Sequence, residues 1–179
     1  MMKAGYIRKA GILVAALAFL AAGATSALAA SGSLYDKLRA DPQFSTLVRI
    51  IDANGVKSAY TGASARTVFA PTNAAFNAIT NGYADMLAPA NISVKQNTQA
   101  LLLYEIVPGR IDVGEIKGKT RQVMTVQGSK ETIDGTGPQI SFGPPPYGAL
   151  VNGAPIKASN GVILPVDRLP VPVFADGKP

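Results

Sequence analysis

The chain has 179 residues, with 17 basic and 11 acidic side chains, a formal net charge of +6, and neither histidine nor cysteine. The absence of these two residue types excludes Ser-His-Asp and Cys-His catalytic sites, the usual transition-metal sites and any disulfide. A chain of this length is expected to form one domain, and it can bury enough surface to fold without disulfides.

The N-terminus has the layout of a secretory signal. Lys3, Arg8 and Lys9 precede an uncharged apolar run over residues 10–24, which is shorter than the roughly 20 residues that cross a bilayer. The following Ala27-Leu28-Ala29 has the small-x-small pattern of a cleavage site. We expect cleavage after Ala29, and a retained N-terminal anchor is the alternative.

Cleavage there defines a signal peptide over residues 1–29 and a single exported domain over residues 30–179 with a short C-terminal tail. This domain carries 14 basic and 11 acidic residues, a net charge of +3. A charge this small argues against a dedicated nucleic-acid binder. No second long apolar stretch follows the signal, so we expect no transmembrane anchor after cleavage and a periplasmic or extracellular location.

The first part of the exported domain has helical periodicity. Apolar residues three and four positions apart predict two helices within residues 34–54, divided at Asp41-Pro42 and ended by Asn54-Gly55. The β-branched and apolar run at 67–70 predicts a short buried strand. Two further helices are predicted over 74–79 and 97–107.

The second part reads as short strands. Their expected positions are 111–116, 122–127, 131–133, 139–142, 149–151 and 162–166. Asn152-Gly153 and Asn160-Gly161 indicate tight type I′ hairpin turns, because Asn-Gly best tolerates the positive φ angles that such turns need. Helices followed by strands predict an α+β fold.

Catalytic motifs are sparse. The segment 114–120 resembles a phosphate loop, but its spacing is one residue short and no βαβ unit surrounds it. Glu105, Asp112 and Glu115 are close enough in sequence to supply a glycosidase carboxylate pair, although ordinary solvated acids are the simpler interpretation in a chain without tryptophan. We therefore predict a protein that is not an enzyme and that uses no cofactor, metal or catalytic residue.

Several residues are candidates for contact with a partner. Tyr104 either belongs to an exposed adhesive patch or buries its ring at the end of a helix. Lys117, Lys119 and Arg121 are two positions apart, so on a strand they would share one face, which would meet an anionic polysaccharide or lipid headgroups or would simply be solvated. Tyr147 follows three prolines, which form either an extended polyproline segment with Tyr147 as its anchor or a stiff loop between strands.

Three stretches of the chain together resemble the fasciclin domain family. They are Thr67-Val68-Phe69-Ala70-Pro71-Thr72-Asn73-Ala74-Ala75-Phe76, then Leu102-Leu103-Tyr104-Glu105-Ile106-Val107-Pro108-Gly109, then Val151-Asn152-Gly153-Ala154 with Ala158-Ser159-Asn160-Gly161-Val162-Ile163. The resemblance spans residues 31–172 and implies a fasciclin-like β-wedge with N-terminal helices packed along it. It also implies a role in cell adhesion or extracellular-matrix interaction, and bacterial members of the family are typically secreted single domains.

Two positions depart from the pattern of this family. Tyr104-Glu105 stands where the second motif has Tyr-His, and Leu164-Pro165 stands where the last motif has histidine after Val-Ile. Pro165 also lacks a backbone donor, which suggests an edge position or a bulge in the last strand.

The resemblance and the residue inventory together lead to one expected function. The exported domain should bind a cell-surface or matrix protein or polysaccharide, or a lipid or other anionic surface, without covalent chemistry. The candidate contact residues are Tyr104, Glu105, Tyr147, Lys117, Lys119 and Arg121. The alternative is a periplasmic carrier that holds an apolar small molecule or lipid between the helices and the wedge.

Overall fold

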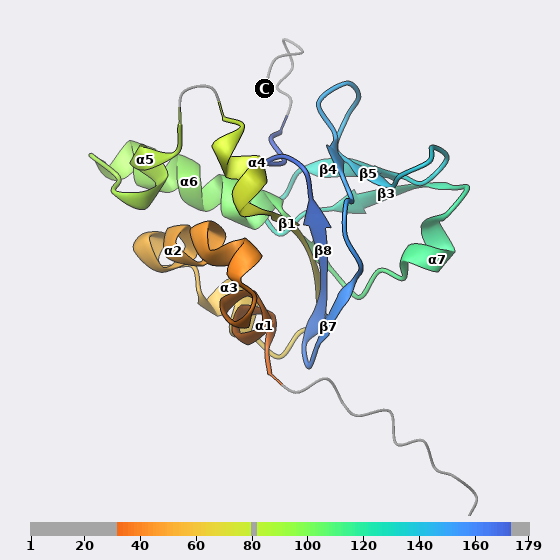
Figure 1. The fold of residues 1–179 in the computed structure, drawn as a ribbon, viewed down its shortest axis with the longest axis horizontal. Helices are drawn as coiled ribbons and strands as arrows, with labels where there is room; N and C mark the ends of the chain where they lie inside the picture. Colours follow the sequence, from red (N-terminus) through yellow and green to blue (C-terminus); the bar gives the residue numbers. More distant parts are fainter. Residues whose placement is uncertain (1–31, 80–81, 173–179) are drawn as a thin grey trace, which may run out of the picture.

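The computed structural model of the chain describes residues 32–79 and 82–172, so the expected signal peptide lies outside the described residues. It contains two four-stranded sheets, with strand orders β2-β1-β8-β7 (sheet A) and β3-β4-β5-β6 (sheet B). A layer of helices covers sheet A on the side away from sheet B (Figure 1). The α+β class predicted from the sequence is confirmed.

The helical layer begins where the sequence predicts it. Its first elements are α1 (Leu34–Ala40), the 3-10 helix η1 (Pro42–Phe44), α2 (Ser45–Asn54) and α3 (Ser58–Thr61). The Asp41 side chain accepts a hydrogen bond from the Gln43 amide at 3.1 Å and starts η1. Gly55 then adopts a φ of 71°, which ends α2. The predicted division at Asp41-Pro42 is therefore confirmed.

The remaining helices of this layer follow strand β1 (Arg66–Pro71) or the loop after it, and the last of them is the longest helix of the described residues. They are α4 (Asn73–Asn77), α5 (Ala84–Leu87) and α6 (Ile92–Tyr104). Asn91 caps α6 by accepting a hydrogen bond from the Val94 amide at 3.0 Å, so the helix begins five residues before the predicted start. It ends at Tyr104, earlier than predicted, because the chain continues as strand β2.

Sheet A is built around two parallel strands, β1 (Arg66–Pro71) and β8 (Gly161–Val166), which pair over all six residues of each. On the outer sides, β2 (Ile106–Pro108) pairs with β1 and β7 (Ile156–Ala158) pairs with β8, both antiparallel. β7 ends its pairing with β8 at Ile163. Pro165 lies beyond that ladder, but it pairs with Ala70 on one side and its carbonyl oxygen accepts a hydrogen bond from the Asn152 amide at 3.0 Å on the other. The edge position suggested for this residue is therefore corrected.

Sheet B is antiparallel and packs against the other face of sheet A. Its strands are β3 (Thr120–Met124), β4 (Lys130–Asp134), β5 (Ser141–Phe142) and β6 (Ala149–Leu150). A single helical turn, α7 (Val113–Ile116), precedes it. Residues 111–116 had been predicted as a strand; the structure corrects this, because Asp112 accepts a hydrogen bond from the Gly114 amide at 2.7 Å and caps a helical turn.

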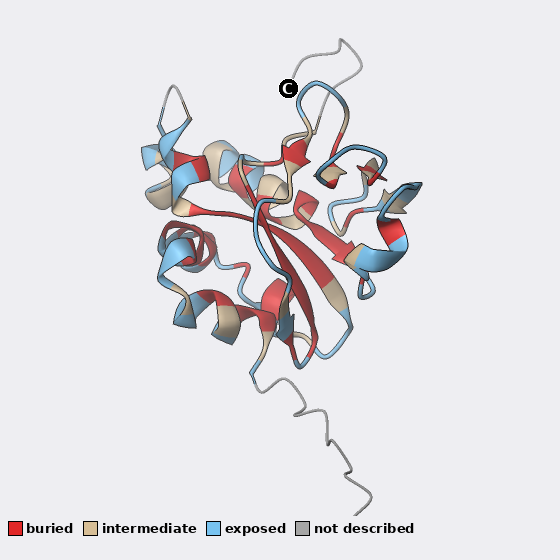
Figure 2. Ribbon diagram, turned by 45° about the vertical axis from the view of Figure 1, so that its right-hand side comes forward, coloured by how far each residue is buried: buried red, intermediate tan, exposed pale blue. Residues whose placement is uncertain are grey.

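Sheet A separates two hydrophobic cores because its side chains alternate between its faces. Val68, Ala70 and Ile163 join the core beneath the helices. Phe69, Val162, Leu164 and Val166 join the core shared with sheet B. Figure 2 shows the central strands buried along nearly their whole length, as expected for parallel strands covered on both faces.

Of the two Asn-Gly pairs, one lies at a hairpin as predicted and the other does not. Asn152-Gly153 lies between β6 in sheet B and β7 in sheet A, so it forms no tight hairpin. Asn160-Gly161 does belong to the β7–β8 hairpin, but the closing pair is Ala158 with Gly161, and Gly161 has no positive φ. Its Cβ would lie 2.1 Å from the carbonyl oxygen of Arg66. Glycine is required there by the close approach of β1.

Asn160 ties this hairpin to the helices. Its side-chain oxygen accepts a hydrogen bond from the Leu34 amide at 2.8 Å. Its side-chain nitrogen donates to the carbonyl oxygens of Tyr60 at 3.0 Å and Gly62 at 2.7 Å. One buried side chain therefore connects α1, the end of α3 and the start of β8.

We expect Gly161→Ala to lower the free energy of unfolding by at least ~1–3 kcal/mol, since an overpacked core forces backbone shifts of this cost. Urea denaturation of the two proteins measures the difference. Gly137→Ala is the matched control, because its Cβ would meet nothing nearer than 3.6 Å and its φ is not positive. Equal effects of the two substitutions would contradict the close-approach explanation.

Candidate functional site

Tyr104 ends α6 and is completely buried between the two sheets. Its ring packs against Phe142 with the centroids 5.6 Å apart, and Phe142 stacks on Phe69 at 4.1 Å. The hydroxyl has no hydrogen-bond partner. Burial raises the pKa of this hydroxyl, and the nearby Glu131 carboxylate raises it further although it does not reach hydrogen-bond geometry. Of the two alternatives for Tyr104, the structure shows the buried ring.

Glu105 follows directly and is also 0 % exposed. Its backbone is part of the fold, since the carbonyl oxygen accepts a hydrogen bond from the Phe69 amide at 2.9 Å. Neither carboxyl oxygen has a partner, and burial raises the pKa of this group well above its ordinary value. Burial raises the pKa of the nearby Tyr60 hydroxyl, and the Glu105 carboxylate raises it further by a smaller amount.

These positions correct the expectation that Tyr104 and Glu105 contact a partner. Both side chains are enclosed between packed layers, so no partner can reach them in this conformation. The departure at Glu105 from the Tyr-His motif that this stretch resembles therefore changes the interior of the domain rather than its surface.

We expect Glu105→Gln to raise the free energy of unfolding at neutral pH. The pKa of the Glu105 carboxyl is higher in the folded than in the unfolded protein, so the natural chain has its full stability below the unfolded-state pKa of 4.5. Its free energy of unfolding falls as the pH rises from there toward the folded-state pKa, at up to about 1.4 kcal/mol per pH unit. Glutamine has nearly the same shape but does not titrate. Urea denaturation between acidic and neutral pH should show the two proteins converging at low pH and diverging above it.

The control for this prediction is Glu115→Gln, which removes an exposed carboxylate from α7. It should leave the pH profile of the natural chain in place. A Glu105→Gln profile parallel to that of the natural chain at every pH would show that Glu105 does not titrate inside the core.

Tyr147 lies in the loop between β5 and β6 and its side chain is 40 % exposed. The Tyr147 amide donates a hydrogen bond to the Pro144 carbonyl oxygen at 2.9 Å, which closes a turn. At the base of the loop, the Gly143 amide donates to the Thr132 carbonyl oxygen at 3.0 Å. The extended polyproline alternative is therefore not observed, and the stiff loop between two strands is.

The three basic candidates do not share one strand. Lys117 follows the last residue of α7, Gly118 turns the chain with a φ of 76°, and Lys119 precedes β3. Only Arg121 lies within the strand. All three are exposed. The prediction that they share one strand face is wrong, because the helical turn of α7 and Gly118 keep Lys117 and Lys119 outside the strand.

The carboxylates considered for catalysis are not brought together as a pair with Glu105. Glu105 is buried, whereas Asp112 and Glu115 belong to the cap and the exposed side of α7. In the described part of the chain, no group of three or more His, Cys, Asp or Glu side chains could hold a metal ion. Within residues 32–79 and 82–172, no helix has both the length and the apolar character needed to cross a membrane.

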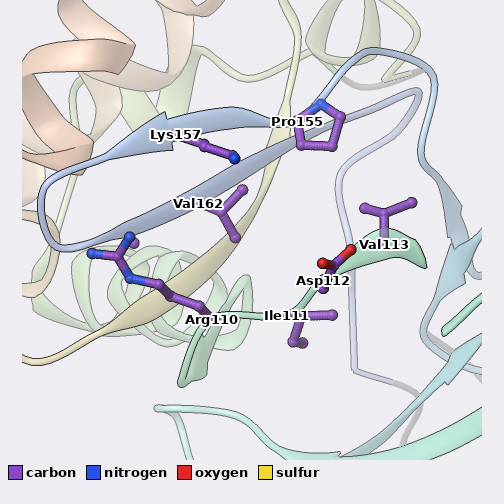
Figure 3. A pocket seen from close by; sticks show the side chains of 8 residues that line it. Arg110, Ile111, Asp112, Val113, Pro155, Lys157 and Val162 are labelled. Atoms are coloured by element: carbon purple, nitrogen blue, oxygen red, sulfur yellow. The ribbon is translucent and has the colours of Figure 1, made fainter. Parts of the chain in front are cut away.

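A cavity of about 360 Å³ opens between the β7–β8 hairpin and the chain that follows β2. Arg110, Ile111 and Asp112 line one wall, while Lys157 and Val162 line the other (Figure 3). Sequence reasoning did not single out Arg110 or Lys157. They are 47 positions apart and belong to no shared motif, so only the pairing of the strands brings them to one cavity.

Comparison with known proteins gives a consistent family. The fasciclin domain family matches residues 42–172. Human periostin is 34% identical over 149 residues, which are 80% of this chain but 16% of periostin. Protein sll1483 of Synechocystis sp. is 32% identical over 130 residues, which are 72% of this chain and 67% of that protein.

Among solved structures, a FAS1 domain pair from the insect cell adhesion molecule fasciclin I aligns with 75% of this chain and 43% of that chain, with 19% identity and a TM-score of 0.45. The family match covers both sheets and all but the first helix of the described fold. The chain therefore belongs to the fasciclin domain family.

Proposed function

We propose that this chain is an exported fasciclin domain that binds cell-surface or extracellular-matrix components through noncovalent contacts. The observation that carries the proposal is the family match over residues 42–172, since membership of the fasciclin domain family implies a role in cell adhesion or extracellular-matrix interaction. The N-terminal basic residues, apolar run and small-x-small site support export to the periplasm or beyond.

Tyr147 is the contact residue that the structure favours most among the candidates. It is an exposed aromatic side chain on a loop whose backbone is fixed at both its base and its turn. A rigid loop loses little conformational entropy when a partner binds, and tyrosine is enriched among the residues that dominate binding energy. An exposed tyrosine in this setting is suited to anchor a partner.

Lys117, Lys119 and Arg121 support a second, electrostatic contribution. The strand register places Lys119 beside Gly135, while the Tyr147 loop continues from Phe142 on the side of Thr132. Lys117 and Lys119 therefore lie beyond one end of sheet B, whereas Arg121 is in the same row of the sheet as Phe142, the residue before the Tyr147 loop. Exposed charges of one sign steer an anionic partner toward the domain, and their effect weakens as salt increases.

We expect Tyr147→Ala to weaken binding to the recognised partner by about tenfold or more, the effect of losing a residue that contributes over 1 kcal/mol. Binding is measured against a panel of matrix proteins, polysaccharides, lipid vesicles and intact cells. Ile92→Ala is the matched control, because Ile92 is another large apolar side chain, 66 % exposed, but lies at the start of α6. Equal affinities of the two variants would remove Tyr147 from the contact surface.

Arg121→Gln should lower affinity at low salt and flatten the dependence of affinity on salt concentration, because one steering charge is lost. The control is Arg49→Gln, which removes an exposed arginine from α2 in the helical layer. The same salt dependence in both variants would show that the charge of the whole domain attracts the partner, and not the group formed by Lys117, Lys119 and Arg121.

A further inference from the structure

The cavity beside the β7–β8 hairpin has walls that the fold holds in place. The Thr67 hydroxyl accepts a hydrogen bond from the Ile111 amide at 2.9 Å and donates to the Gly109 carbonyl oxygen at 2.8 Å, which fixes the chain around Arg110. On the other wall, Lys157 is directly opposite Val162 in the β7–β8 ladder. The site therefore exists before any ligand arrives.

Two cations face this cavity without a carboxylate partner. The Arg110 guanidinium donates to the carbonyl oxygen of Ser159, which is uncharged and leaves other N–H groups of the guanidinium free. Lys157 makes neither a hydrogen bond nor an ion pair with the described residues. The ion pair found among those residues joins Arg168 and Asp167. Both side chains are exposed to solvent at the cavity. An anionic group can thus bind both without displacing another anion.

The wall that carries Arg110 also carries an acceptor. Asp112 uses one carboxyl oxygen to cap α7 through the Gly114 amide at 2.7 Å, and its other oxygen makes no hydrogen bond within the described residues. Figure 3 shows Lys157 extending from β7 toward the wall that carries Asp112. A cation on each wall and a carboxylate on the wall of Arg110 suit a ligand that has both a carboxylate and hydroxyl donors.

The floor between these charges is apolar. Ile111 and Val162 are buried core residues that reach the cavity, and Pro155 closes it from the loop before β7. The volume of about 360 Å³ lies at the small end of ligand sites, which begin at roughly 300 Å³. It matches a compact body such as one saccharide ring, whose C–H groups can rest on aliphatic side chains.

We propose that this cavity binds a sugar acid, with the carboxylate held by Arg110 and Lys157, a hydroxyl held by Asp112, and the ring over Ile111 and Val162. The inference goes beyond the adhesion function proposed above, because it concerns a small free ligand and different residues.

The test is a titration of the purified protein with galacturonate, followed by NMR or calorimetry, with galactose as the neutral counterpart. Galacturonate should bind saturably and galactose should not. Lys157→Gln should weaken galacturonate binding by about tenfold, the effect of one charge-assisted hydrogen bond. Lys130→Gln is the control, since it removes an exposed lysine of β4 that does not line the cavity.

A second variant tests the role of the acceptor. Asp112→Asn keeps a good helix cap but replaces the charged acceptor, so it should weaken binding of galacturonate relative to binding of cyclohexanecarboxylate, which has no hydroxyls and experiences only the loss of charge repulsion. Equal binding of galacturonate and galactose, no saturable binding of either, or equal affinity of the Lys157 and Lys130 variants would overturn the proposal. The titration contains no cells, matrix protein or polymer, so its result is independent of the contact surface around Tyr147.

Discussion

The parallel pairing of β1 with β8 is the constraint on which the rest of this domain depends. It joins strands whose paired residues are 95 positions apart in the sequence, as in Arg66 with Gly161, and both faces of these strands are buried. The helices can cover one face and sheet B the other only because these two strands are apolar along their length. Contacts so distant in sequence make loop closure costly before they form, so the tight fit at Gly161 and the three bonds of Asn160 help to stabilise this pairing.

Buried polar groups divide into two kinds around this pairing. Asn160 and Thr67 have their hydrogen bonds satisfied and connect neighbouring segments. The Glu105 carboxyl and the Tyr104 hydroxyl are enclosed without partners, which costs free energy when the group is polar and far more when it is charged. The latter two occupy the Tyr-His position of the family motif. A neutral Glu105 is the form that this interior tolerates, so we expect the stability to fall as this carboxyl loses its proton.

The local parts of the fold could be predicted from sequence, and the nonlocal parts could not. Asp41-Pro42 and Gly55 mark helix ends through their own backbone preferences, so they were predicted correctly. β2 and β7 are three residues long, too short for a periodic signal, and α7 depends on a single cap at Asp112. The burial of Tyr104 could not be settled from its helix, because its neighbours Phe142 and Phe69 come from distant strands.

The candidate sites follow the same division. Tyr147 could be identified from sequence because prolines and glycines flank it locally, although its turn conformation required the structure. Arg110 and Lys157 meet only because β2 and β7 lie on opposite edges of the β1–β8 pair and the chain after β2 crosses that face of the sheet to reach α7. Thr67 holds this crossing segment from within the buried strand. The interaction that builds the core therefore also forms the cavity, so the cavity is a consequence of the fold and its charge is set by the few side chains that line it.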